Sequence, residues 1–142
     1  MRRLALILLA LMMLVNAGCG GEVTVVASTG NATIVVTTAS PPTISLAQFI
    51  QEASTRTVFG SIDFRTSGPD LGTRTITVAD SGGVIAYRGV DDLAAYSGLL
   101  NGTIPFSINY APFPPDTYAF TIFVSNRAGN LSNPVYGSFR VL

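Results

Sequence analysis

Residues 117–125, which read TYAFTIFVS, decide the fold of this chain. Apolar side chains recur at every second position of this stretch, and the residues between them are mostly Thr, Ala and Ser. The side chains that we expect to be buried are those of Tyr118, Phe120, Ile122 and Val124. A period of two is typical of a β-strand with one face in a core and the other toward solvent. The stretch therefore predicts such a strand, with Phe123 as a large apolar side chain on its outer face.

Four further runs with the same spacing surround this strand. They are residues 58–65, 73–79 and 103–110, and a last strand that contains Phe139 and Val141. Turn-forming residues separate the runs, and no long stretch has a helical period; residues 48–54 would form a helical turn at most. Pro105 removes an N–H donor from its run, which favours an edge strand. Short strands about ten residues apart predict an all-β fold, a single antiparallel β-sandwich.

The first eighteen residues have the pattern of a signal peptide. Two arginines, Arg2 and Arg3, precede an apolar block over residues 4–15, and Asn16, Ala17 and Gly18 follow it. A membrane-spanning helix needs about 20 apolar residues, and this block is shorter. We therefore expect residues 1–18 to be a targeting segment that is removed on export.

The stretch LVNAGC, residues 14–19, resembles the lipobox of bacterial lipoproteins. The resemblance implies that Cys19 is acylated, becomes the mature N-terminus and binds membrane lipid in the cell envelope. Gly20 stands where Asp resembles an inner-membrane retention signal, so we expect the outer membrane in a cell that has one. The alternative is a plain secretory signal cleaved near Ala17, with Cys19 as a bystander thiol. Cys19 is the only cysteine, so an intramolecular disulfide is excluded.

Residues 19–43 are rich in Thr, Ser and Val and carry few charges. We expect them to form a loosely ordered spacer between the lipidated cysteine and the sandwich, with Pro41 and Pro42 as its rigid end. Two β-rich runs, residues 23–26 and 34–37, flank turn chemistry and leave a hairpin open as the alternative.

A second resemblance covers residues 44–142. The stretch from Pro114 to Tyr118, together with residues 120–130, resembles the F strand and F–G turn of fibronectin type III and related bacterial immunoglobulin-like domains. Residues 59–64 similarly resemble a B strand. The resemblance implies an immunoglobulin-like sandwich in which Tyr118 is a tyrosine corner, its hydroxyl bonded to a backbone group near the preceding turn. An ordinary strand aromatic is the alternative for Tyr118.

The composition excludes most catalytic chemistry. The 142 residues include neither His nor Lys, so a Ser-His-Asp triad, a His-ligated metal and a lysine nucleophile are excluded. From Cys19 onward the net charge is −2, which argues against nucleic acid as a partner. Asp91 and Asp92 are adjacent, and we expect them in a solvated loop. We therefore expect no enzyme activity, cofactor or metal.

Aromatic side chains are the remaining candidates for contacts with a partner. Phe113 lies between prolines in a stiff loop and is the first candidate; its alternative role is to plug the end of the sandwich. Tyr87, Tyr96 and Phe123 are further candidates, Phe123 being either covered by residues 23–37 or part of a protein-binding patch.

These residues predict a non-enzymatic surface lipoprotein whose sandwich binds a protein or a glycan. One rival is a carbohydrate-binding accessory module, which would require Phe113, Tyr87 and Tyr96 on one surface. The other rival is an enzyme that uses carboxylates alone.

Overall fold

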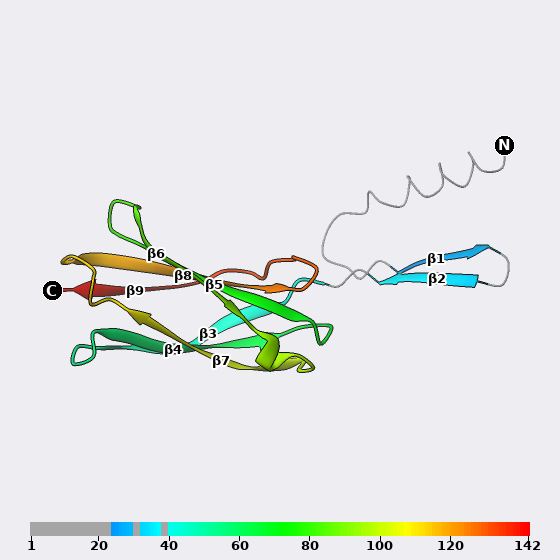
Figure 1. The fold of residues 1–142 in the computed structure, drawn as a ribbon, viewed down its shortest axis with the longest axis horizontal. Coiled ribbons are helices and arrows are strands. Elements are labelled where there is room, and N and C mark those ends of the chain that lie inside the picture. Colours follow the sequence, from blue (N-terminus) through cyan, green and yellow to red (C-terminus); the bar gives the residue numbers. More distant parts are fainter. Residues whose placement is uncertain (1–23, 30–31, 38–39) are drawn as a thin grey trace. The chain divides into compact units, whose positions relative to one another are not determined.

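The computed structural model describes residues 24–29, 32–37 and 40–142 (Figure 1). The chain divides into two compact units, residues 1–38 and 39–142. The expected signal peptide, residues 1–18, and Cys19 lie outside the described residues. Within the described part of the chain, no helix has both the length and the apolar character that a membrane crossing needs.

The first unit contains an antiparallel hairpin. It consists of β1 (Thr24–Thr29) and β2 (Ala32–Thr37), with Val26 opposite Val35. Val, Ile and Thr make up most of both strands, and β-branched residues fit the extended backbone. The stretch that we expected to be a loosely ordered spacer thus includes the hairpin that its two β-rich runs had left open.

The second unit is an all-β sandwich of two antiparallel sheets (Figure 1). Its strands are β3 (Thr43–Glu52), β4 (Thr57–Arg65), β5 (Leu71–Ala79), β6 (Ile85–Asp92), β7 (Asn101–Asn109), β8 (Asp116–Asn126) and β9 (Val135–Val141). One sheet has the order β3-β4-β7 and the other the order β6-β5-β8-β9. A 3₁₀ turn, η1 (Ala94–Tyr96), follows β6. The predicted antiparallel sandwich is confirmed.

The core lies between the two sheets. Tyr118, Phe120, Ile122 and Val124 of β8 are all buried, as their spacing predicts. Phe120 is fully buried, and its ring lies 5.6 Å from that of Phe106 in β7 and 5.3 Å from that of Phe49 in β3. Burying an apolar side chain of this size contributes roughly 1.5–3 kcal/mol to folding. β8 is therefore the central strand of the core.

Two strands differ from the expectation. Residues 48–54 were expected to form at most a helical turn, but β3 runs through Glu52, with a bulge between Leu46 and Gln48. Asp91 and Asp92 were expected in a loop, but both lie in β6. The bulge reverses the phase of β3, and nearly every residue of β6 is exposed, so neither strand has a regular buried period.

Side chains close the two open sides of the sandwich. Between β3 and β9, the Asn133 amide accepts from the Ile44 N–H at 2.9 Å and donates to the Ile44 carbonyl at 2.7 Å. The Gln51 amide donates to the Arg140 carbonyl at 2.6 Å. On the opposite side, Arg74 of β5 donates to the Pro105 carbonyl of β7. Side-chain bonds thus replace the main-chain ladder where the two sheets separate.

Candidate interaction surface

Phe113 is not displayed to solvent. Its side chain is only 7% exposed, and its ring lies 4.9 Å from that of Tyr118 and 6.4 Å from that of Phe139. Its N–H donates to the Tyr110 carbonyl at 3.0 Å. Phe113 therefore plugs the end of the sandwich, the second of the two roles that its loop had left open, and its ring is not available as a contact residue.

Tyr118 lies beneath this plug. It is buried, and its hydroxyl donates to the carbonyl of Pro114 at 3.0 Å, four residues earlier. This is the bond that a tyrosine corner makes. Burial raises the pKa of Tyr118, and the nearby charges of Asp116 and Asp80 raise it further. The phenol is therefore held in its neutral, donating form.

Tyr96 and Tyr87 lie elsewhere on the molecule. Tyr96, in η1, is half-buried and contacts Phe64 edge-on with ring centroids 6.1 Å apart. Phe64 lies at the end of β4 and Phe113 at the end of the sandwich where β4 begins. The Tyr87 ring lies back over Gly89 of its own strand. Phe113, Tyr87 and Tyr96 therefore share no common surface.

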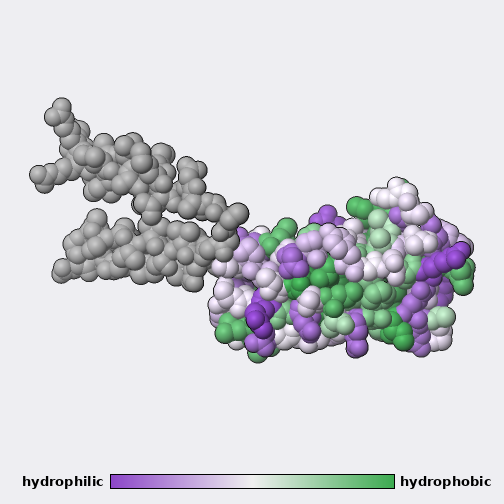
Figure 2. All heavy atoms as spheres, turned by 180° about the vertical axis from the view of Figure 1, so that it is seen from behind, coloured by the Kyte–Doolittle hydropathy of each residue, from purple (hydrophilic) through white to green (hydrophobic). Residues whose placement is uncertain are grey.

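Phe123 lies on the outer face of the four-stranded sheet. It is half-buried and stands opposite Thr75 of β5, which in turn stands opposite Val90 of β6. In the next row, Thr121 stands opposite Tyr136 of β9, which is 66% exposed. The two aromatic rings thus belong to a mixed face of threonine and apolar side chains. Figure 2, which shows the molecule from behind the view of Figure 1, has apolar and polar residues interleaved over the surface of residues 40–142.

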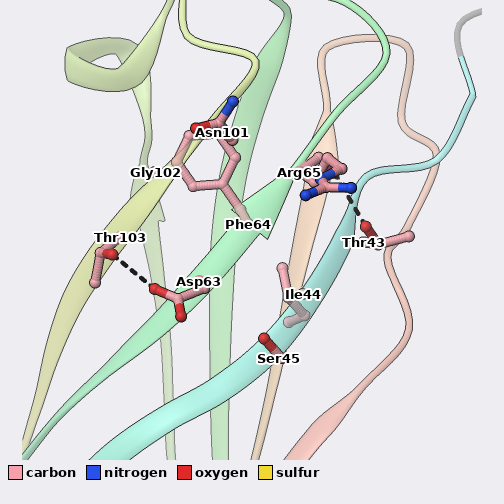
Figure 3. A pocket seen from close by; sticks show the side chains of 9 residues that line it. All are labelled: Thr43, Ile44, Ser45, Asp63, Phe64, Arg65, Asn101, Gly102 and Thr103. Carbon is pink, nitrogen blue, oxygen red and sulfur yellow. Dashed lines mark hydrogen bonds between the residues drawn. The ribbon is translucent and has the colours of Figure 1, made fainter.

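An open hollow of about 570 Å³ lies on the outer face of the three-stranded sheet, where β3 begins (Figure 3). The register places Asp63 between Ser45 and Thr103, and Arg65 between Thr43 and Asn101. Thr103 Oγ1 donates to Asp63 Oδ1 at 2.6 Å, so the two side chains point toward each other in Figure 3. The hollow offers an exposed guanidinium and a carboxylate, which can bind a polar group.

Sequence reasoning had not selected this hollow. The alternation over residues 58–65 already placed Asp63 and Arg65 on the outer face of their strand. The residues that flank them lie in β3, whose bulge interrupts the alternation, and in β7, whose register with β4 the sequence does not give. The sequence therefore predicted the β4 residues of the hollow but not those of β3 and β7.

The described carboxylates bind backbone and side-chain donors within the protein. Every described acidic side chain except that of Asp70 accepts a hydrogen bond; these are Glu52, Asp63, Asp80, Asp91, Asp92 and Asp116. The Thr117 N–H, followed by the Ser81 hydroxyl, holds the pKa of Asp116 below its usual range. Among the described residues, no three or more His, Cys, Asp or Glu side chains are grouped so that they could hold a metal ion. The contacts of Asp80 and Asp92 with backbone N–H groups two to four residues later are typical of acidic side chains that shape turns.

No protein-family model matches the chain, and no curated protein sequence matches it. Among solved structures, the apo structure of Bacteroides uniformis β-glucuronidase 3 is similar, with a TM-score of 0.36 and 15% identity. The similarity covers 75% of this chain and 13% of that one, so the chain spans a small part of that enzyme's length.

Proposed function

We propose that this protein is an exported, lipid-anchored and non-enzymatic surface protein that presents an immunoglobulin-like binding module. The leader supports the anchor, because a positive start and an apolar block precede the stretch LVNAGC. Acyl chains on Cys19 would hold the protein in the membrane of the cell envelope, the outer membrane where there is one.

The strand order supports the immunoglobulin-like class. With the seven strands β3–β9 lettered A to G in chain order, the sheets read A-B-E and D-C-F-G. Constant-type immunoglobulin domains have A-B-E-D and C-F-G, so the arrangement differs only in the sheet that the fourth strand joins. The bond from Tyr118 to Pro114 and its place at the start of strand F agree with a tyrosine corner.

The observation that carries the binding role is the engagement of the carboxylates. Asp116 and Asp80 accept hydrogen bonds from turn residues, and Asp91 accepts from Arg74, so these carboxylates help to shape the scaffold. The exposed groups that could contact a partner include Arg65 in the hollow and apolar side chains of the outer faces, such as Tyr136 beside the half-buried Phe123. Exposed apolar surface of this kind often marks a site that binds another protein.

A protein is the partner that these surfaces favour. The glycan-binding alternative needed Phe113, Tyr87 and Tyr96 together, and the structure holds them apart. β3 begins at one end of the sandwich, and the loops of residues 53–56 and 80–84 lie at the other. Residues 81–84 and 53–56 of these loops are exposed, and exposed loops often carry the contacts with a second molecule.

The anchor is tested by intact mass of the protein extracted from cell membranes. We expect a chain beginning at Cys19 with added acyl mass, and a Cys19→Ser variant that is neither acylated nor retained in membranes. A mature chain without acyl groups would contradict the anchor and leave the binding role standing.

The non-enzymatic role is tested with a panel of glycoside and ester substrates. We expect no turnover by the full-length protein. Turnover that falls in the Asp63→Asn variant, and not in a matched Asp92→Asn variant at an exposed carboxylate outside the hollow, would assign the hollow to catalysis and contradict the proposal.

A further inference from the structure

The outer edge of β6 is exposed over its whole length. β6 ends the strand order β6-β5-β8-β9 and, within the described residues, pairs with β5 alone. Val90 and Ile85 are 59% and 60% exposed. β6 contains no Pro, which would remove an N–H donor from the edge. Its charged side chains, Arg88, Asp91 and Asp92, protect an edge only against partners that oppose like charges. The strand is therefore open to pairing with another strand.

The register shows which backbone groups of β6 are free. The Leu93 N–H donates to the Gly72 carbonyl at 2.8 Å, in line with the pairing of Arg74 with Asp91. Hydrogen-bonded pairs alternate along an antiparallel ladder, so Asp91, Gly89 and Tyr87 direct their N–H and C=O groups toward β5. It follows that Arg88, Val90 and Asp92 direct theirs away from the sheet.

The side chains at these three positions make the edge self-complementary. We propose that β6 pairs antiparallel with β6 of a second copy of this chain, with Val90 facing Val90 on the two-fold axis. In that register Arg88 faces Asp92 of the copy, and the pair occurs twice. All three side chains are exposed. The Asp92 Oδ1 accepts the Ala94 N–H at 2.8 Å, which leaves Oδ2 for the guanidinium.

Other registers are less favourable. A dimer centred on Arg88 would oppose two guanidinium groups, and one centred on Asp92 would oppose two carboxylates, which destabilises a strand pair. A shift of one residue would instead leave Arg88 opposite Val90. Of these registers, only the Val90-centred one places Arg88 opposite Asp92 of the copy and Val90 opposite Val90.

The dimer would join two four-stranded sheets into one. The new ladder would contribute about six main-chain hydrogen bonds. It would also cover Val90 and extend the row of Phe123, Thr75 and Val90 across the axis into the second copy. The pairing goes beyond the proposed anchored role and does not depend on acylation of Cys19.

Charge exchange tests the register. The full-length protein in mild detergent is expected to show concentration-dependent dimers by sedimentation. Arg88→Asp and Asp92→Arg should each weaken self-association at least tenfold, because each variant opposes like charges. An equimolar mixture should recover dimers, since the introduced aspartate of one variant would face the introduced arginine of the other, and the unsubstituted Arg88 and Asp92 would face each other at the second pair.

A positive charge on the two-fold axis is a second test. Val90→Lys, which removes no hydrogen bond of the monomer, should also abolish dimers. Circular dichroism melts check that each variant folds.

A disulfide test locates the axis. Facing residues of a hydrogen-bonded antiparallel pair have Cα atoms about 5.5 Å apart, within the range of a disulfide. Val90→Cys should therefore cross-link on mild oxidation. Tyr136→Cys, at an exposed position on the far edge strand of the same sheet, and the unsubstituted chain with Cys19 are the controls. A chain that stays monomeric, dimers that survive Val90→Lys, or cross-linking no faster than in the controls would each overturn the proposal. So would occupation of the edge by the β1–β2 hairpin or by a different protein.

Discussion

The Tyr118 hydroxyl ties the start of β8 to the preceding proline loop, and its removal is a clean test of that bond. Tyr118→Phe keeps the ring against Phe113 and Phe139 but leaves the Pro114 carbonyl without its donor. We expect the melting temperature to fall by roughly 4–8 °C, as for one net hydrogen bond in a domain of this size. Tyr136→Phe, at an exposed tyrosine, is the matched control and should melt like the natural chain.

Asp116 makes part of the stability depend on acid pH. Its pKa is lowered in the folded protein by the Thr117 N–H and the Ser81 hydroxyl. The stabilisation is therefore present above the ordinary carboxyl pKa and is lost as the pH falls through the lowered folded value. The natural chain should melt above Asp116→Asn at pH 7, and this difference should vanish in acid.

The comparison variant for Asp116 is Ser81→Ala, which removes one donor and keeps the carboxylate. Thermal melts between pH 7 and pH 2 should show a smaller acid-dependent loss than in the natural chain. An equal difference between the natural chain and Asp116→Asn at every pH would contradict the role assigned to ionisation.

Whether a side chain points into the core or toward solvent was predictable from the sequence only where the alternation of its own strand sets that direction. The spacing of β8 placed Tyr118 and Phe120 inside and Phe123 outside. For Phe113 both display and burial stayed open, because the prolines beside it fix the stiffness of the loop but not the direction of the ring. That direction depends on Tyr118 and Phe139, which come from two other strands.

At the scale of the elements, the Asn133 side chain makes the two hydrogen bonds with Ile44 that a neighbouring strand would otherwise make, and so links β3 to the start of β9. Asn133→Ala leaves both backbone groups of Ile44 without partners and should cost roughly 1–2 kcal/mol. Hydrogen exchange at the Ile44 amide should accelerate correspondingly. Asn101→Ala, at an exposed asparagine at the start of β7, serves as control, and equal effects of the two substitutions would refute this account.

The strands that the sequence predicted are those with one buried face. β4, β5, β7 and β8 each alternate between core and solvent, and β9 does so through Phe139 and Val141. β3 was missed because its bulge after Leu46 changes which parity points inward. β6 was missed because an overhanging edge strand buries neither face. Irregular pairing and edge position depend on tertiary neighbours, which local periodicity does not contain.

On the scale of the whole molecule, stability depends on which side of the central strand a ring occupies. Phe120→Ala would empty space between Phe106, Phe49 and the close approach of Gly137, at a cost of about 3–5 kcal/mol. The free energy of unfolding of a whole domain is only about 5–15 kcal/mol, so this substitution would remove a large share of it. Phe123→Ala, on the opposite face of the same strand, should cost roughly 1 kcal/mol. Denaturant titration distinguishes the two, and comparable losses would contradict the two-sheet core.

The two amide bridges have a mechanical consequence. Ile44 meets Asn133 near one end of the sandwich and Gln51 meets Arg140 near the other, so β3 and β9 run side by side in the same direction. The described sandwich begins with β3 at one end and finishes with β9 at the opposite end. Tension along this axis would load both bridges in shear at once, and they would have to rupture together. Resistance to pulling would then depend on the rate of that single event more than on the equilibrium stability of the fold.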